Sequence, residues 1–486
     1  MLGRPGRIPH DGAPPAGQVC AARRCPASVG RMPHASTALL TDMYELTMIE
    51  GALRSGTAGR RSVFEVFSRR LPGGRRYGVV AGTARVLDAV EEFRFGPAEL
   101  DYLAAAGVVG AETLEYLRGY RFGGSITGYG EGECYFPGSP ILTVEGTFAD
   151  AVVLETVVLS ILNHDSAVAA AASRMTVAAH GRPCLEMGAR RTHEGAAVAA
   201  ARAAVVGGFV GTSVLEGGRS YGIRPIGTAA HSFTLVHDDE EAAFAAQVAT
   251  MGPGTTLLVD TYDVPRGVER AVAAARAAGG ELGAVRLDSG DLVAQAFTVR
   301  HQLDDLGATS TKITVTSDLD EYAIAALGAA PVDSYGVGTR LVTGSGHPTA
   351  ELVYKLVARE DATGRMAEVA KASAAKASVG GLKVAGRVLD GERRAAEELV
   401  VACTRWEQGL AELERAGARP LQVPLVRDGE IVEEHRGPGA LEAARERHQA
   451  SRAELPYAAW RLSEGEPGIP TRMMDVDLAD DPDYVV

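Results

Sequence analysis

From about residue 180 the chain repeats one pattern: a short apolar run ends in polar or glycine residues and is followed by an alanine-rich stretch. Runs of this kind end at CLEMGARR (184–191), GGFVGTS (207–213), RPIGTAAHS (224–232), LLVDTYD (257–263), AVRLDSGD (284–291), ITVTSDLD (313–320) and YGVGTR (335–340). Regular alternation of strands and helices predicts an α/β fold with parallel strands, and seven or eight such units predict an irregular (β/α) barrel. A doubly wound open sheet is the competing architecture, but no GxGxxG opens a first βα unit to support it.

The remaining segments predict smaller domains around this array. Residues 62–68 have the pattern of a strand, and 83–93 and 97–118 have helical patterns. The apolar stretch 151–173 predicts a helix that leads into the repeated region. The boundaries that these changes of pattern predict are a disordered extension over 1–35, an N-terminal α+β domain over 36–150, the barrel over 151–355, a C-terminal domain over 356–463 and an acidic tail over 464–486.

Charge, cysteine content and hydropathy exclude several classes of protein. The formal net charge of −13 argues against a general nucleic-acid binder, because phosphate backbones require a basic surface. The 5 cysteines are odd in number and lack metal-ligand or redox spacing, which is typical of a reducing cytoplasm. The longest apolar run, 149–163, is interrupted by Asp150 and Glu155. It therefore predicts a buried helix rather than a membrane span, and we expect a cytoplasmic protein.

The residues at the predicted strand ends share a chemical character. Arginines suit carboxylate or phosphate oxygens, backbone N–H groups of a glycine turn can approach a phosphate, and carboxylates can hold ribose hydroxyls or a hydrated Mg²⁺. The candidates are Arg190, Arg191 and Arg286; Gly336, Gly338 and Thr339; and Asp260, Asp263, Asp288, Asp291 and Asp318. Together they indicate a ligand that is both phosphorylated and polyhydroxylated, such as a sugar phosphate.

His231 ends another of these predicted strands, with only alanines and a serine beside it. Small neighbours leave room for a large group to approach the ring, and imidazole is a competent nucleophile and proton carrier at neutral pH. Each feature also has a plainer interpretation. The histidine can be hydrogen-bonded within a loop, and Asp288 and Asp318 can be helix N-caps. It is the coincidence of all these residues at one end of one array that favours a functional site.

Several ordered motifs between about Thr37 and Arg461 make the chain resemble nicotinate phosphoribosyltransferases. The segments that carry the resemblance are TDMYELTM (41–48), EMGARR (186–191), GTAAHS (227–232), DTYD (260–263), RLDSGDL (286–292) and GVGTR (336–340). Membership would imply a type II phosphoribosyltransferase fold. In that fold an irregular α/β barrel is joined to a sandwich-like domain built from N- and C-terminal segments, usually in a dimer with sites at the subunit interface.

The reaction that the resemblance implies joins nicotinate to phosphoribosyl pyrophosphate and gives nicotinate mononucleotide and pyrophosphate, with ATP hydrolysis coupled to it and Mg²⁺ as cofactor. It implies that His231 is phosphorylated by ATP. The other roles that the resemblance and the residue types suggest are nicotinate binding by Tyr44, Thr228, Arg286 and Arg190, a catalytic position for Asp288, and donor binding by Gly338, Thr339 and Asp318. The acids that would hold Mg²⁺ stay open.

Two features of the resemblance bear on the pyridine ring. Met187 stands where many relatives carry an aromatic residue, which leaves open how the ring is enclosed on that side. Tyr44 lies on a predicted N-terminal helix, and nothing in its local pattern places it over its own barrel. We therefore expect a homodimer in which Tyr44 completes the site of the neighbouring subunit, because this segment crosses to the partner in the family.

Other functions remain compatible with parts of the pattern. A phosphoribosyltransferase for nicotinamide would favour an acid near the carboxamide, whereas Ser213 is uncharged, and one for quinolinate would need more basic residues. A catalytically silent nucleotide-binding sensor on the same fold would be free to lose His231, Arg286 and Asp288. A Schiff-base aldolase using Lys312 is disfavoured, because this lysine falls at the amino end of its predicted strand.

Overall fold

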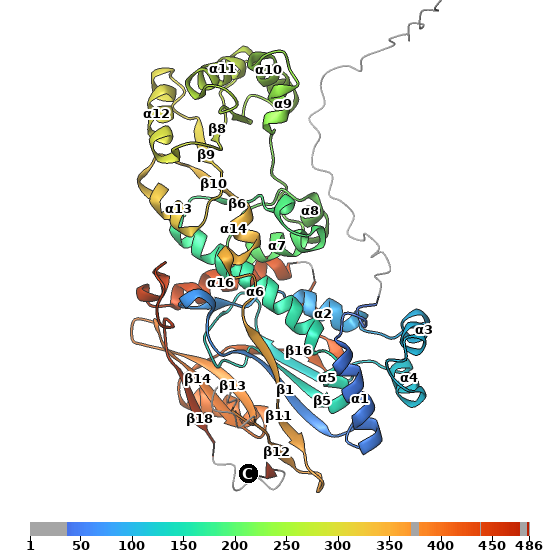
Figure 1. Ribbon diagram of the computed structural model, residues 1–486. Coiled ribbons are helices and arrows are strands. Elements are labelled where there is room, and N and C mark those ends of the chain that lie inside the picture. The colour runs from blue at the N-terminus through green and yellow to red at the C-terminus, as the bar shows by residue number, and fades with distance from the viewer. Residues whose placement is uncertain (1–35, 371–378, 438, 477–483, 486) are drawn as a thin grey trace, which may run out of the picture. The chain divides into compact units, whose positions relative to one another are not determined.

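The computed structural model describes residues 36–370, 379–437, 439–476 and 484–485. The predicted extension over 1–35 lies outside these residues, as does part of the predicted acidic tail. Between residues 184 and 337, five parallel strands form one sheet in the order β6-β10-β9-β8-β7 (Figure 1). Their bounds are β6 (Cys184–Glu186), β7 (Thr256–Leu258), β8 (Ala284–Leu287), β9 (Lys312–Val315) and β10 (Ser334–Val337). The predicted parallel α/β architecture is confirmed.

Helices separate these strands in the sequence, as the alanine-rich stretches predicted. They are α7 (Glu194–Val206), α8 (Leu215–Tyr221), α9 (His231–Leu235), α10 (Glu240–Met251), α11 (Val264–Ala277), α12 (Leu292–Asp305), α13 (Glu321–Ala326) and α14 (Thr339–Val342). Asp263, Asp291 and Asp320 cap α11, α12 and α13, since each carboxylate accepts backbone N–H bonds of the first turn. The caps are therefore not Asp288 and Asp318, which remain available for other contacts.

The parallel sheet continues beyond β6 through two further segments. Single parallel bridges join Glu186 to Thr212 and Thr212 to Pro225, so the order extends to seven segments. No pairing among the described residues joins the segment at Pro225 to β7 at the other edge. These pairings define an open parallel sheet with seven segments. The predicted barrel would in addition require its two edges to pair with each other.

The remaining described strands form three other sheets. The N- and C-terminal parts of the chain share the largest, which has the order β17-β16-β3-β5-β1-β11-β12-β19. A sheet of C-terminal strands has the order β15-β13-β14-β18, and β2 pairs with β4. The N-terminal strands are β1 (Arg61–Ser68), β2 (Gly78–Val79), β3 (Ser125–Tyr129), β4 (Cys134–Tyr135) and β5 (Leu142–Thr147). The C-terminal strands are β11 (Leu352–Glu360), β12 (Met366–Glu368), β13 (Leu382–Leu389), β14 (Ala395–Cys403), β15 (Arg419–Pro420), β16 (Gln422–Arg427), β17 (Glu430–Ile431), β18 (Thr471–Asp475) and β19 (Tyr484–Val485). Because β1 pairs with β11 and β3 with β16, the two ends of the chain build one structure.

The helix α6 (Glu155–Ala178) connects this part to the parallel sheet (Figure 1). It contacts α2 and β11 of this part, and it contacts α7 and α13, which belong to the part with the parallel sheet. The region Phe148–Ala178 is long and apolar enough to cross a membrane by length and composition. Most of its residues from Val157 onward are buried inside the protein, so its apolar character is explained by packing in the core.

The other helices outside the region of the parallel sheet come before α6 or after β14 in the chain. They are α1 (Met43–Ser55), α2 (Thr83–Glu92), α3 (Pro97–Ala105), α4 (Ala111–Arg118), α5 (Phe148–Val152), α15 (Trp406–Arg415) and α16 (Ala440–Glu454). The helical pattern over 97–118 is divided between α3 and α4, because the chain turns at Gly107 with a φ of 64°. The helix α1 is fastened to the start of α6 by Glu45, whose Oε1 accepts bonds from the Thr156 N–H at 2.9 Å and hydroxyl at 2.6 Å.

Glu45 provides a test of this junction between α1 and α6. Its side chain is buried, and Oε2 has no partner among the described residues. Burial raises the pKa of the Glu45 carboxyl to about 7, and the neighbouring Glu155 and Asp42 add to the rise against the two bonds from Thr156. Because the folded pKa lies above the ordinary value, the stabilisation belongs to the protonated form and is lost as the pH rises through about 7.

We therefore expect Glu45→Gln to raise the melting temperature at pH 8, because the amide keeps the acceptor for Thr156 and removes the buried charge. The gain should disappear at pH 5, where wild-type Glu45 is protonated. Thermal unfolding at the two pH values measures the difference, with Glu112→Gln on α4 as the control for an exposed charge. A variant that is less stable than wild type at pH 8 would contradict the assignment.

Candidate active site

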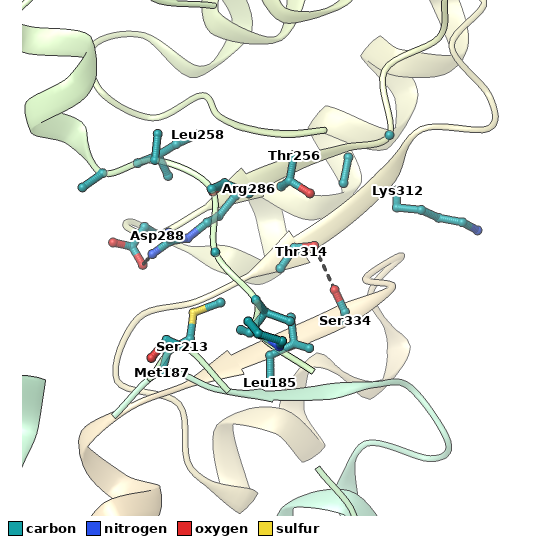
Figure 2. A pocket seen from close by; sticks show the side chains of 18 of the residues that line it. Leu185, Met187, Ser213, Thr256, Leu258, Arg286, Asp288, Lys312, Thr314 and Ser334 are labelled. Carbon is teal, nitrogen blue, oxygen red and sulfur yellow. Dashed lines mark hydrogen bonds and ion pairs between the residues drawn. The ribbon is translucent and has the colours of Figure 1, made fainter. Parts of the chain in front are cut away.

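A cavity of about 680 Å³ lies within the parallel sheet, lined by side chains from every strand from β6 to β10 and by residues 224–231. Figure 2 shows Arg286 and Asp288 on one side of it and Met187 and Ser213 on the other. A smaller cavity of about 160 Å³ adjoins it. Both are lined by Met187, Arg190, Arg286 and Asp288. A ligand in one cavity and a ligand in the other would meet at these four residues.

The larger cavity exists because the inward-facing positions of the strands carry small residues. Thr256, Ala284, Thr314 and Ser334 line it, and the Thr314 and Ser334 hydroxyls lie 2.8 Å apart in a hydrogen bond (Figure 2). In closed (β/α) barrels such positions are ordinarily filled by layers of bulky branched side chains. Hydroxyl and methyl groups at these positions leave room for a small planar ligand, and they supply polar contacts along its length.

Arg286 is the cation that the structure holds most firmly in the larger cavity. Its Nε donates to Thr316 Oγ1 at 2.9 Å, and its Nη2 lies 3.2 Å from Asp288 Oδ1. The Thr316 hydroxyl also donates to Asp288. These contacts occupy one edge of the guanidinium group and fix its plane, which leaves the remaining N–H donors for a ligand. A planar fork of this kind matches a carboxylate.

His231 is the first residue of α9 and reaches the same cavity. Its Nδ1 lies 3.1 Å from Thr261 Oγ1, and its Nε2 lies 3.9 Å from both Asp260 Oδ1 and Asp288 Oδ2. The ring is 39% exposed, whereas the Asp260 side chain is 1% exposed, and its Oδ1 has no hydrogen-bond partner among the described residues. Two carboxylates therefore lie near Nε2, and the ring is accessible to a ligand.

The smaller cavity has the composition of a site for phosphate and ribose oxygens. Arg190 and Arg191 face it from the turn after β6, and Asp318 faces it from the turn after β9. The backbone of Asp318 has a positive φ of 35°, and that of its neighbour Ser317 has a φ of 97°. Residues other than glycine adopt such conformations at an energetic cost, and they occur often at functional sites.

Close approach of two strands explains one glycine in this cavity. A Cβ on Gly336 would lie 2.5 Å from Thr316 Cγ2 and 2.7 Å from Met187 Sδ, closer than real contacts allow. The Met187 thioether therefore occupies the space over Gly336, at the boundary between the two cavities. The sequence departure at Met187 is thus part of the wall that a bound ring would touch.

The structure brings most of the predicted site residues together. His231, Thr228, Arg286, Asp288 and Arg190 line the larger cavity. Gly338, Thr339 and Asp318 line the smaller one. The other predicted acids are used elsewhere: Asp263 and Asp291 cap helices, and Asp260 lies behind the site, where it accepts bonds from the Asp288 N–H and the Ser289 hydroxyl at 2.8 Å each.

Tyr44 is the predicted site residue that lines neither cavity of its own chain. It lies on α1, is 45% exposed, and is accompanied on this surface by the exposed side chains of Leu40 and Met43. Burial, followed by the charges of Glu155 and Glu45, raises the pKa of the Tyr44 hydroxyl to about 12, so the phenol is neutral.

The sequence interpretation missed several residues at the site. Thr316, which holds Arg286, and Thr261, which contacts His231, stand within the strand ends TVTSD and DTYD that drew attention only for their acids. Arg224 lines the larger cavity as a further cation. The sequence signal for the threonines was their position next to those acids. Threonine is too common in strands for the residue type alone to indicate a site.

Comparisons with known proteins place the chain in a family. The model of the nicotinate phosphoribosyltransferase N-terminal domain matches residues 39–163, and that of the nicotinate phosphoribosyltransferase family matches residues 183–383. A nicotinate phosphoribosyltransferase of Mycobacterium tuberculosis is 54% identical over 442 residues, covering 89% of this chain and 94% of that protein. The enzyme of the same name from Bacillus subtilis is 37% identical, covering 70% of each chain.

Solved structures support the same fold. The crystal structure of human nicotinic acid phosphoribosyltransferase aligns with a TM-score of 0.74 at 24% sequence identity, covering 90% of this chain and 98% of that one. The crystal structure of nicotinate-nucleotide pyrophosphorylase from Pyrococcus furiosus aligns with a TM-score of 0.68 at 25% identity, covering 88% of this chain and 99% of that one. The matched family models, the similar relatives and the shared fold lead to one conclusion: this chain belongs to the nicotinate phosphoribosyltransferase family, a family of enzymes.

Proposed function

We propose that the chain joins nicotinate to phosphoribosyl pyrophosphate across its two adjoining cavities, and that ATP hydrolysis is coupled to this reaction through a phosphohistidine at His231. The observation that carries the proposal is a fixed arginine and a carboxylate, Arg286 and Asp288, where the cavities meet, with His231 in the larger cavity 3.9 Å from Asp288. The similar relatives named nicotinate phosphoribosyltransferase support the substrate assignment.

In this proposal the pyridine ring occupies the larger cavity with its carboxylate on the free edge of Arg286. The uncharged Ser213 lines the same cavity, which suits an anionic base and offers no acid for a carboxamide. The phosphate groups of the donor occupy the smaller cavity, where Gly338 and Thr339 supply donors. Asp318 is placed to accept bonds from ribose hydroxyls.

The bond change takes place at the boundary of the two cavities. The lone pair of the pyridine nitrogen forms a bond to C1 of ribose as the bond from C1 to the pyrophosphate oxygen breaks, and pyrophosphate leaves with that electron pair. Positive charge develops on the ribose as the leaving group departs. The carboxylate of Asp288 stabilises that charge at a fixed distance, without reorganisation during the reaction. It accepts the Thr316 hydroxyl, and the Asp288 backbone N–H donates to Asp260.

The acids of the smaller cavity fit a bound Mg²⁺. No cluster of three or more His, Cys, Asp or Glu residues suited to a metal occurs in the part of the chain that the structure describes. Mg²⁺ in phosphate-transferring sites needs only one or two carboxylates, since water and ligand phosphates complete its coordination. Asp288 and Asp318 would hold it, and Mg²⁺ would then supply neutralisation of the pyrophosphate charge.

The assembly that we propose is a cytoplasmic homodimer of subunits with an irregular barrel over about 151–355 and a second domain from the flanking segments. Pairing of Thr212 with both Glu186 and Pro225 supports the barrel, since it joins the segment at residues 224–226 to the sheet whose strands line the same cavity. The exposed apolar side chains around Tyr44 support a partner on α1. Cys134, Cys184 and Cys403 are free thiols, in agreement with a reducing compartment.

His231→Ala should abolish the stimulation by ATP and leave slow formation of nicotinate mononucleotide, because His231 accepts the phosphoryl group and does not bond to ribose. Acid-labile phosphate from labelled ATP should appear in wild type and be absent from the variant. His237→Ala is the matched control, since that ring bonds to Phe233 O and lines neither cavity. Equal labelling of His231→Ala and wild type would rule out the phosphohistidine.

Arg286→Lys should raise the KM for nicotinate although the charge is kept, because an ammonium group cannot replace a two-point contact with a carboxylate. A loss of roughly 1–3 kcal/mol is reasonable for a charge-assisted bond. Steady-state kinetics measure it, with Arg276→Lys on the outer helix α11 as control. Unchanged KM and kcat for nicotinate would mean that Arg286 does not contact the base.

Mixing Tyr44→Ala with His231→Ala under conditions of subunit exchange should restore about half of the ATP-stimulated activity per heterodimer, because one of its two sites then has both residues intact. Mixing Arg286→Ala with His231→Ala is the control, and it should restore none, since both residues line the cavity of one chain. If exchange is demonstrated and the first mixture stays as inactive as the second, Tyr44 does not act in the partner's site.

A further inference from the structure

A buried carboxylate without a cation lies directly behind the larger cavity. Glu186, the last residue of β6, is 0% exposed. Its Oε1 accepts the Gly188 N–H, and its Oε2 accepts the hydroxyl of Thr212, which is also 0% exposed. No lysine, arginine or histidine among the described residues forms an ion pair with it, and burial raises the pKa of this carboxyl. Such an acid costs the fold stability, which points to a function beyond packing.

Thr212 connects Glu186 to the two outer segments of the parallel sheet. Its N–H donates to Arg224 O at 3.1 Å, and its carbonyl accepts the Ile226 N–H at 2.9 Å. Its hydroxyl oxygen also accepts the Val214 N–H at 3.1 Å while the hydroxyl donates to Glu186. Thr212 takes part in both bridges, while backbone bonds from the Val210 N–H to Cys184 O and from the Glu186 N–H to Gly211 O also join its segment to β6.

The segments that this pair joins carry one side of the site. Gly188 opens the turn that presents Arg190, and Ser213 follows Thr212 and donates its N–H to Glu186 O at 2.9 Å. Residues 224–226 lead directly into the loop that carries Thr228 and His231. Asp318, Gly338 and Thr339, which we assign to the donor, follow β9 and β10 instead.

We propose that Glu186 and Thr212 are positioning residues for the nicotinate and His231 side of the site, and that they set the distance between the Arg190 turn and the His231 loop. This inference rests on the proposed function of that side. Neither residue lines a cavity, so neither touches substrate. Their effect is transmitted through the Gly188 N–H, the Ser213 N–H and the backbone of residues 224–226.

Thr212→Val tests the proposal, since it keeps the shape of the side chain and removes the hydroxyl that bonds to Glu186. We expect the KM for nicotinate to rise about tenfold while the KM for phosphoribosyl pyrophosphate stays within about twofold, a change equivalent to about 1.4 kcal/mol at one subsite. Thr212→Ser, which restores the hydroxyl, should return both values to those of wild type. Labelling of His231 by ATP should fall with Thr212→Val and recover with Thr212→Ser.

Thr143→Val is the matched control, because Thr143 is a buried threonine of β5 whose hydroxyl has no partner among the described residues. It should change neither KM. Unchanged kinetics in a folded Thr212→Val, or an equal rise in both KM values, would overturn the proposal. Glu186→Ala is the second variant and should give the same split. If neither variant folds, the pair is a core element and the proposal is wrong.

Failure of this inference is separable from failure of the proposed function. If wild-type protein does not convert nicotinate, the function itself is wrong, whatever the variants do. If wild type converts nicotinate and the variants show no selective change, the function stands and the positioning role of Glu186 and Thr212 is rejected.

Discussion

The contact among Arg286, Thr316 and Asp288 is the interaction on which the site depends. It fixes a cation and an anion side by side, 3.2 Å apart, where the two cavities meet. Without Asp288 as a partner, the guanidinium group of Arg286 in a partly buried cavity would be free to turn toward any anion. Because Thr316 bonds to both groups, their orientation is fixed. In the proposed reaction the outer edge of the arginine meets the carboxylate of the base, and the acid faces the ribose.

The room for a ligand comes from small side chains, and its chemistry comes from the strand ends. Thr256, Ala284, Thr314 and Ser334 leave the interior of the sheet unfilled, whereas the apolar residues on the outer faces of the same strands pack against helices. This division explains why the fold tolerates an open interior. The free energy of burial is gained on the helical side of the sheet, and the inner side is available for function.

Much of the fold and part of the site could be predicted from the sequence. The periodic strand ends predicted the strands β6 to β10, and the structure brings Arg286, Asp288 and His231 to one cavity, because parallel strands bring their carboxyl ends to one edge. Contacts between distant segments could not be predicted in this way. The bond from Thr261 to His231 and the link from Glu186 to Thr212 depend on the packing of loops, which local pattern does not determine. Likewise, N-caps fell on Asp291 and Asp320 rather than on Asp288 and Asp318, which only the backbone geometry decides.

The central claim is that the cavity selects an anionic pyridine base and couples its use to ATP. It is tested most directly by initial rates of mononucleotide formation for the purified full-length protein with phosphoribosyl pyrophosphate and either nicotinate or nicotinamide, each with and without ATP. We predict conversion of nicotinate, faster with ATP, and a much lower rate with nicotinamide, which lacks the carboxylate for Arg286. Equal rates for the two bases, or rates for nicotinate that ATP does not change, would contradict the account.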